Sequence, residues 1–162
     1  MKTSAGQPQL APIVANAVSH VLNTQFNLSA QALSEPPAVP DGYASKLQSR
    51  IDLSGARVQG EIVLSLPDAL ANLLVAHMLG LPDTATASDA DKLDLAGEFC
   101  NMLAGQIGGA LTSSGYINDL STPRVQRLGA GASPGADSDF NGAWCCAGQP
   151  FTLSLSLRFE PT

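Results

Sequence analysis

Positive charge is scarce in this sequence. Its 162 residues contain 8 Lys and Arg against 14 Asp and Glu, which gives a net charge of −6 at pH 7 and an isoelectric point near 4.6. A protein that binds a nucleic-acid backbone needs basic residues to displace counterions from the phosphates. We therefore expect no nucleic-acid partner.

Long apolar runs are also missing. The longest one, Leu70 to Leu81, is interrupted by Asn72 and His77 and is too short to cross a bilayer. Residues 1–9 are polar and lack the apolar stretch of a secretory signal. The sequence therefore predicts a cytoplasmic protein with no membrane-spanning segment.

Cysteine and histidine are too few and too scattered to indicate a metal site. Cys100, Cys145 and Cys146 show no paired metal-ligand spacing, and the two histidines lie in different predicted helices. Adjacent cysteines are poorly placed to bridge each other, so we expect reduced thiols, with Cys145 and Cys146 as small strand residues. We expect the protein to bind no metal and no cofactor of its own.

Two common catalytic motifs are absent as well. No Gly-x-Ser-x-Gly sequence marks a serine nucleophile. The run Gly-Ala-Gly-Ala-Ser-Pro-Gly within residues 129–139 lacks the Gly-Lys-Ser/Thr ending of a phosphate-binding loop and does not lead into a predicted helix. We interpret that run as a mobile hairpin loop.

The sequence does contain a clear order of helix and strand patterns. Apolar residues at helical spacing predict helices over residues 10–26, 69–79 and 88–111. Alternating apolar residues predict strands over 46–53, 57–66, 122–128, 141–148 and 150–160, and the composition of 27–43 predicts a loop. We expect one domain over residues 1–162, with 1–9 disordered. The predicted fold class is α+β, with helices packed on one face of a largely antiparallel sheet.

The helix predicted over residues 88–111 has two contrasting faces. Its apolar face consists of Leu95, Phe99, Met102, Leu103, Ile107 and Ala110. Its opposite face carries Asp94, Glu98, Asn101 and Gly105. Glu98 has no Lys or Arg three or four residues away, and Gly105, Gly108 and Gly109 lie where a surface helix favours Ala. This composition suits close approach by another molecule better than a solvated surface.

Glu98 and Asn101 are the candidates for chemistry on that face. Their spacing of three residues makes them neighbours on a helix, so both side chains can reach one target. A carboxamide can hold a water molecule in line with an electrophile, and a carboxylate can pair with a cation of a partner. Because the pair has no metal or nucleophile of its own, the remaining machinery would have to come from the substrate.

The run from Asp94 to Gly105 resembles the Asp-x-x-x-Glu-x-x-Asn-x-x-x-Gly helix of CheX-type chemotaxis phosphatases, which are relatives of CheC and of the flagellar switch protein FliM. The same order of segments is found on either side, over about residues 12–111. These segments are the Pro-Ile-Val start of the first helix, the strand Gly-Glu-Ile-Val-Leu-Ser from Gly60, and the helix end Ala-His-Met-Leu-Gly from Ala76. The resemblance therefore covers much of the chain.

This resemblance implies a CheX-like fold and a protein phosphatase that hydrolyses the aspartyl phosphate of a CheY-like response regulator. By analogy, Asn101 would position the attacking water and Glu98 would pair with the lysine beside the phosphoaspartate. The regulator would supply Mg²⁺. Asp94 and Gly105 would contact the regulator; the alternatives are a charge near the helix start for Asp94 and helix packing for Gly105. Family members often pair through sheet edges, so a homodimer is a further expectation.

The sequence departs from the CheC pattern and leaves other functions open. CheC-type relatives carry a second Glu-x-x-Asn helix, whereas the opening helix here reads Val-Ala-Asn-Ala-Val-Ser-His from Val14, so one site is expected. A non-catalytic scaffold for a regulator or a flagellar-switch component is the main alternative. A small-molecule binder is a third possibility and would need a roomy apolar pocket.

Overall fold

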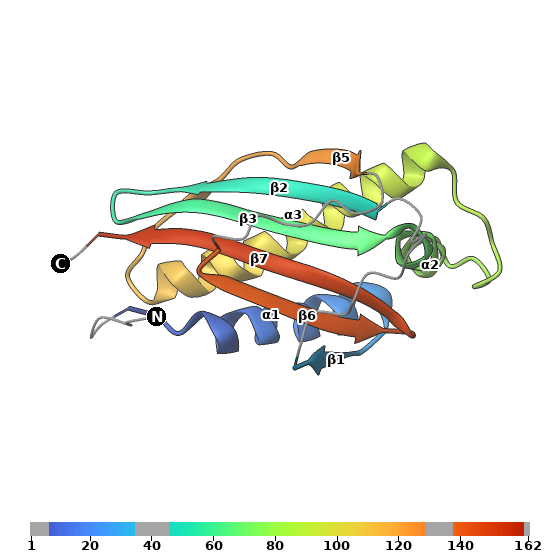
Figure 1. Ribbon diagram of the computed structural model, residues 1–162, viewed down its shortest axis with the longest axis horizontal. Coiled ribbons are helices and arrows are strands. Elements are labelled where there is room, and N and C mark those ends of the chain that lie inside the picture. Colours follow the sequence, from blue (N-terminus) through green and yellow to red (C-terminus); the bar gives the residue numbers. More distant parts are fainter. Residues whose placement is uncertain (1–6, 35–45, 129–137, 161–162) are drawn as a thin grey trace.

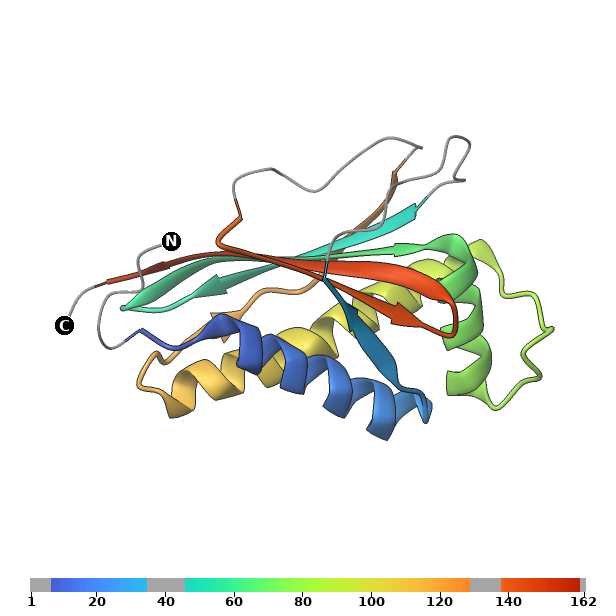
Figure 2. The same ribbon diagram turned by 60° about the horizontal axis from the view of Figure 1, so that its bottom comes forward.

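One antiparallel sheet with helices on a single face makes up the described part of the protein (Figures 1 and 2). The computed structural model describes residues 7–34, 46–128 and 138–160. The helices are α1 (Leu10–Phe26), α2 (Asp68–Leu79) and α3 (Asp89–Ser113). The strands are β1 (Ala30–Leu33), β2 (Lys46–Ser54), β3 (Val58–Pro67), β4 (Asp119–Leu120), β5 (Arg124–Leu128), β6 (Phe140–Cys146) and β7 (Gln149–Phe159). The predicted α+β class is confirmed.

The strand order is β1-β6-β7-β3-β2, with β4 and β5 both paired along the outer side of β2. All pairings are antiparallel, and the central β3 and β7 run side by side from Val58 opposite Phe159 to Ser65 opposite Thr152. Figure 2 shows α1 and α3 lying together under the sheet, with α2 at one end. Among the described residues, the helices thus cover one face, and the opposite face carries mostly polar side chains such as Gln48, Arg50 and Glu61.

The helix boundaries follow the local signals in the sequence. Ser88 caps α3, because its side-chain oxygen accepts a hydrogen bond from the Asp91 amide at 3.1 Å. α2 ends at Gly80, which adopts the left-handed conformation with a φ of 68°. All three predicted helices are confirmed, and their ends lie within two residues of the predicted ones.

Two predictions about the strands are wrong. The loop predicted over residues 27–43 contains β1, an edge strand whose sequence Ala-Gln-Ala-Leu has no β-branched residue and is held by backbone pairing with β6. The strand predicted over 122–128 is β5 alone, beginning at Arg124, and a separate β4 precedes it. Pro123 between them has no N–H to donate to a ladder. Residues 1–6 of the predicted disordered start and residues 129–137 of the predicted hairpin loop lie outside the described residues.

The hydrophobic core lies between the sheet and the helices. Phe99 of α3 is fully buried at its centre, and its ring lies 5.5 Å from that of Phe26 on α1 and 5.7 Å from that of Phe151 on β7. Trp144 of β6 stacks on Phe151 at 5.7 Å. These aromatic contacts join both long helices to the middle of the sheet and hold α3 with its polar side outward.

Gly60 allows β3 and β7 to approach closely. A Cβ added at this position would lie 1.9 Å from the Ser156 carbonyl oxygen, so any larger residue has to separate the two central strands. Gly109 on α3 is the opposite case, since a Cβ there meets nothing within 4 Å.

We expect Gly60→Ala and Gly109→Ala to change stability in opposite directions. Gly60→Ala should lower the free energy of unfolding by about 1 to 3 kcal/mol, because it overpacks the sheet. Gly109→Ala should raise it by about 0.5 to 1 kcal/mol, because alanine restricts the unfolded chain and favours the helix. Urea denaturation measures both, and equal stability of the two variants would contradict the packing described for the central strands.

Candidate functional site

The four candidate residues lie together on the outer face of α3. Asp94, Glu98, Asn101 and Gly105 are all exposed. The apolar residues predicted for the opposite face point inward, with Leu95, Phe99, Leu103 and Ile107 buried and Met102 and Ala110 half-buried. The predicted orientation of α3 is therefore confirmed, and its exposed stripe faces away from the sheet.

Glu98 and Asn101 have no intramolecular partner within residues 7–34, 46–128 and 138–160. Neither side chain forms a hydrogen bond there, and Glu98 forms no ion pair. A carboxylate and a carboxamide in this state are solvated and can turn to a ligand without breaking a contact inside the protein. Asn23 on α1 differs in this respect, since its side chain donates to the Ser19 carbonyl at 2.8 Å.

The outer face of α3 is locally acidic. Asp91, Asp94 and Glu98 are exposed along its first three turns. The cation within this stretch, Lys92, is turned away, and its Nζ lies 2.8 Å from Asp68 Oδ2 on α2. A cationic group of a partner would therefore meet carboxylates that α3's own lysine does not neutralise.

The glycines of α3 serve different purposes. A Cβ added at Gly105 meets nothing within 4 Å, so packing among the described residues does not require glycine there. Gly108, which we predicted on the outer side, is buried, and a Cβ there would lie 2.8 Å from Asn118 Oδ1. The prediction for Gly108 is wrong because the segment that leads to β4 folds back against this turn of α3. Asn118 Nδ2 donates to the Gly108 carbonyl at 3.0 Å.

Cys100 lies between Glu98 and Asn101 in the sequence but on the opposite side of α3. It is fully buried, and its Sγ lies 3.7 Å from the Ser49 carbonyl of β2. Burial raises the pKa of Cys100 to about 11, and contacts with Ser49 and Leu64 offset only part of this rise. A thiol of this kind stays protonated at neutral pH and is no nucleophile for the site.

An ionic cluster that the sequence analysis missed holds the start of α3. Arg127 of β5 binds Asp68 with Nη1 at 2.8 Å and binds Asp89 with Nη2. Lys92 binds the other oxygen of Asp68. The four residues come from α2, α3 and β5, and no sequence spacing links Arg127 to the two aspartates. Only the pairing of β5 with β2 brings them together.

The Asp68 carboxylate is the centre of this cluster. Partial burial raises its pKa, but the hydrogen bonds from Lys92 and Arg127 outweigh that effect, so the pKa of Asp68 lies below its ordinary value of 3.8.

The described residues contain no cluster arranged to hold a metal ion, and the groove described below lies away from α3. No group of three or more His, Cys, Asp or Glu side chains there is arranged to hold a metal. His77 contacts the Phe26 carbonyl and Asp83, while His20 is exposed on α1. A groove of about 640 Å³ is open to solvent and contains no residue of α3; it is lined by Leu53, Ser54, Gln59, Gly60, Glu61, Asp139, Ser156 and Arg158. No helix in the described ranges is long and apolar enough to cross a membrane.

Fold and site together define the class of protein: an α+β domain in which the candidate site is the outer face of one helix and not a pocket. The chain belongs to the chemotaxis phosphatase CheX family, because the model of that family matches residues 47–134, more than half of its length. The matched region contains all of α3 and the whole exposed stripe.

Solved structures share this fold at low sequence identity. CheX from Vibrio vulnificus is 19% identical, with a TM-score of 0.78 over 96% of this chain and 100% of that chain. CheX from Desulfovibrio desulfuricans is 24% identical, with a TM-score of 0.72 over 92% and 99%. CheX in a complex with CheY, BeF3 and Mg²⁺ from Borrelia burgdorferi is 15% identical, with a TM-score of 0.67 over 94% and 99%. No match was found among curated proteins.

The charge state of Asp68 predicts how acid affects stability. Because its pKa is lower in the folded protein, its ionised form stabilises the fold fully above the ordinary pKa of 3.8, and this contribution is lost as the pH falls through the lower folded pKa. We expect Asp68→Asn to be less stable than the original protein at pH 7, with the difference shrinking below pH 4. Thermal unfolding from pH 7 to pH 2.5 measures this.

Asp91→Asn is the matched control for Asp68→Asn. It removes a carboxylate from the same end of α3, but this carboxylate has no ion-pair partner in the described ranges. A pH-independent difference between Asp68→Asn and the original protein would contradict the role assigned to the cluster.

Proposed function

We propose that this protein is a phosphatase that hydrolyses the aspartyl phosphate of a CheY-like response regulator. Membership of the chemotaxis phosphatase CheX family supports the reaction class. The observation that carries the proposal for this chain is the pair Glu98 and Asn101, exposed one helical turn apart on α3 and without partners among the described residues. Asn101 can hold a water molecule and Glu98 can pair with a cation. An aspartyl phosphate on another protein supplies neither of these groups itself.

In the proposed reaction, Asn101 enters the regulator's active site and holds a water molecule in line with the phosphorus. The water oxygen bonds to phosphorus while the bond to the aspartyl oxygen breaks. The regulator regains its carboxylate, and inorganic phosphate leaves with one hydrogen of the water on its new oxygen, while the other hydrogen passes to a phosphoryl oxygen or to solvent. An amide suits this role because it can accept from one hydrogen of the water and donate to the phosphoryl group. Positioning of this kind carries much of the acceleration in phosphoryl transfer.

Glu98 orients the regulator in this proposal. Its carboxylate pairs with the lysine beside the phosphoaspartate, and the acidic surface of Asp91 and Asp94 favours the approach of positive charge. Asp94 contacts the regulator one turn before Glu98. Gly105, one turn after Asn101, lets the regulator's backbone approach α3 closely, because a side chain at this position would project into open space. The Mg²⁺ of the reaction belongs to the regulator, and the Borrelia burgdorferi complex of CheX and CheY, which includes BeF3 and Mg²⁺, supports that choice of partner.

The proposed reaction is tested by the decay of a phosphorylated regulator with and without the protein. Asn101→Ala should lower the acceleration about 100-fold or more, because a misplaced water loses the alignment that the side chain provides. Glu98→Ala should mainly raise the KM for the regulator. Both residues are exposed and unpartnered, so the free energy of unfolding should change by less than about 0.5 kcal/mol.

Gln106→Ala is the matched control, since it removes an exposed carboxamide from α3 on a different side from Asn101. It should keep the original rate. If Gln106→Ala loses as much activity as Asn101→Ala, the proposed role of Asn101 in positioning the water is contradicted. If the protein binds the regulator but does not change the lifetime of the regulator's aspartyl phosphate, it is a scaffold. That result would overturn the enzymatic proposal.

A homodimer formed through a sheet edge is part of the same proposal. β1 and β5 are edge strands, and in the described ranges each pairs along only one side. Sedimentation equilibrium of the cytoplasmic protein should give twice the chain mass of 16.6 kDa. A monomer at all concentrations would contradict this expectation and would leave the α3 site intact.

A further inference from the structure

We propose that β5 positions the site, because it sets how far the α3 turn bearing Glu98 and Asn101 stands from the sheet. This inference rests on the proposed phosphatase function for its activity readout, but its structural basis is independent of that function. Val125 and Arg127 of β5 are the positioning residues. They contact α3 and not the reacting groups.

Close packing at Gly97 is the first observation. Gly97 directly precedes Glu98, is buried, and faces β5. A Cβ added there would lie 3.2 Å from Val125 Cγ2, which is tight enough that the Val125 methyl group or the helix must move by a few tenths of an ångström, whereas its 3.5 Å distance from Pro123 Cγ is an ordinary contact. Glycine at this position therefore allows α3 and Val125 to lie closer together than alanine could without a small movement of one of them.

The ionic cluster at the helix start is the second observation. Arg127, two residues after Val125 on the same face of β5, binds Asp89, the first residue of α3. It also binds Asp68 of α2, whose other oxygen binds Lys92 of α3. The start of α3 and the turn at Gly97 thus both lie against side chains of one short strand.

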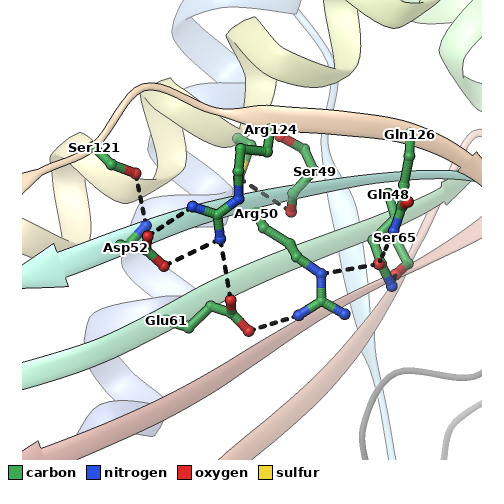
Figure 3. Close-up of polar contacts among 10 residues, drawn as sticks. Gln48, Ser49, Arg50, Asp52, Glu61, Ser65, Ser121, Arg124 and Gln126 are labelled. Atoms are coloured by element: carbon green, nitrogen blue, oxygen red, sulfur yellow. Dashed lines mark hydrogen bonds and ion pairs between the residues drawn. The ribbon is translucent and has the colours of Figure 1, made fainter.

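The opposite face of β5 fastens that strand to the sheet (Figure 3). Arg124 binds Asp52 of β2 at 2.6 and 3.2 Å and Glu61 of β3 at 3.4 Å. Arg50 of β2 binds the other oxygen of Glu61 at 2.6 Å, and Gln126 donates to Gln48 at 3.3 Å. These partly exposed side-chain contacts add modestly to the backbone pairing of β5 with β2, which runs the whole length of the strand.

The two faces of β5 therefore have different tasks. Arg124 and Gln126 hold it to β2 and β3, while Val125 and Arg127 hold α3 to it. Because α3 rests on β5 at the turn before Glu98, a shift of this contact moves Glu98 and Asn101 together and leaves their mutual spacing unchanged. The position of both side chains relative to a bound regulator would change, and catalysis depends strongly on such alignment.

Gly97→Ala is the decisive variant, because its effects on stability and activity should separate. Alanine's preference for the helix should offset the cost of the tight contact with Val125, so the Tm should change little. The added methyl should displace the turn from β5, lower kcat about tenfold and change KM less than about twofold. A purely structural role for Gly97 would instead lower Tm and activity together.

Gly97→Ala combined with Val125→Ala is the rescue variant. Removing the Val125 methyl groups makes room for the new one, so the double variant should be more active than Gly97→Ala alone. Crystal structures should show residues 97–101 displaced from β5 in Gly97→Ala and returned in the double variant. Gly109→Ala, the same substitution at an open position of α3, should cause no such displacement.

The possible outcomes separate this inference from the proposed function. A folded Gly97→Ala with original kcat and undisplaced α3 would overturn the inference, as would a loss of kcat that Val125→Ala fails to rescue. If the original protein does not accelerate dephosphorylation, the proposed function fails. The displacement in Gly97→Ala and its reversal in the double variant then decide the positioning claim alone.

Discussion

The packing of α3 against the sheet is the interaction on which the rest of the molecule depends. Phe99 is buried between Phe26 of α1 and Phe151 of β7, and Trp144 continues the aromatic contacts to β6. Burial of side chains this large is a strong driving force, and it fixes the rotation of the helix about its axis. Glu98 and Asn101 are exposed because their neighbours Phe99 and Cys100 are buried.

Site residues and core residues are neighbours in the sequence but lie on different faces of α3. Two neighbouring buried residues, Phe99 and Cys100, stabilise the fold, and the residues on either side of them face solvent. The proposed site therefore needs no pocket, which suits a substrate that is another folded protein. The separation also explains why Cys100, with its raised pKa, takes no part in the chemistry.

The topology relates two halves of the chain that the sequence does not reveal as a repeat. If β1, β2 and β3 are exchanged with β5, β6 and β7, the order β1-β6-β7-β3-β2-β5 reads the same in reverse. The exchange matches α1, which precedes the first set, with α3, which precedes the second. Yet α1 carries no exposed carboxylate and carboxamide pair like that of α3. The fold thus has two similarly placed helices, and in our proposal one of them acts.

The sequence by itself determined the three helices, most strands, and the polar stripe of α3, because those features depend on local periodicity and capping. Only the tertiary structure decided what depends on contacts between distant segments. β1 was missed because backbone pairing with β6 holds four residues of low strand propensity. Gly108 was placed outside because its neighbour Asn118 comes from beyond the helix. The contacts of α3 with Val125 and Arg127 could not be predicted for the same reason. A helical wheel shows which face of a helix is polar but not which segment packs against its buried face.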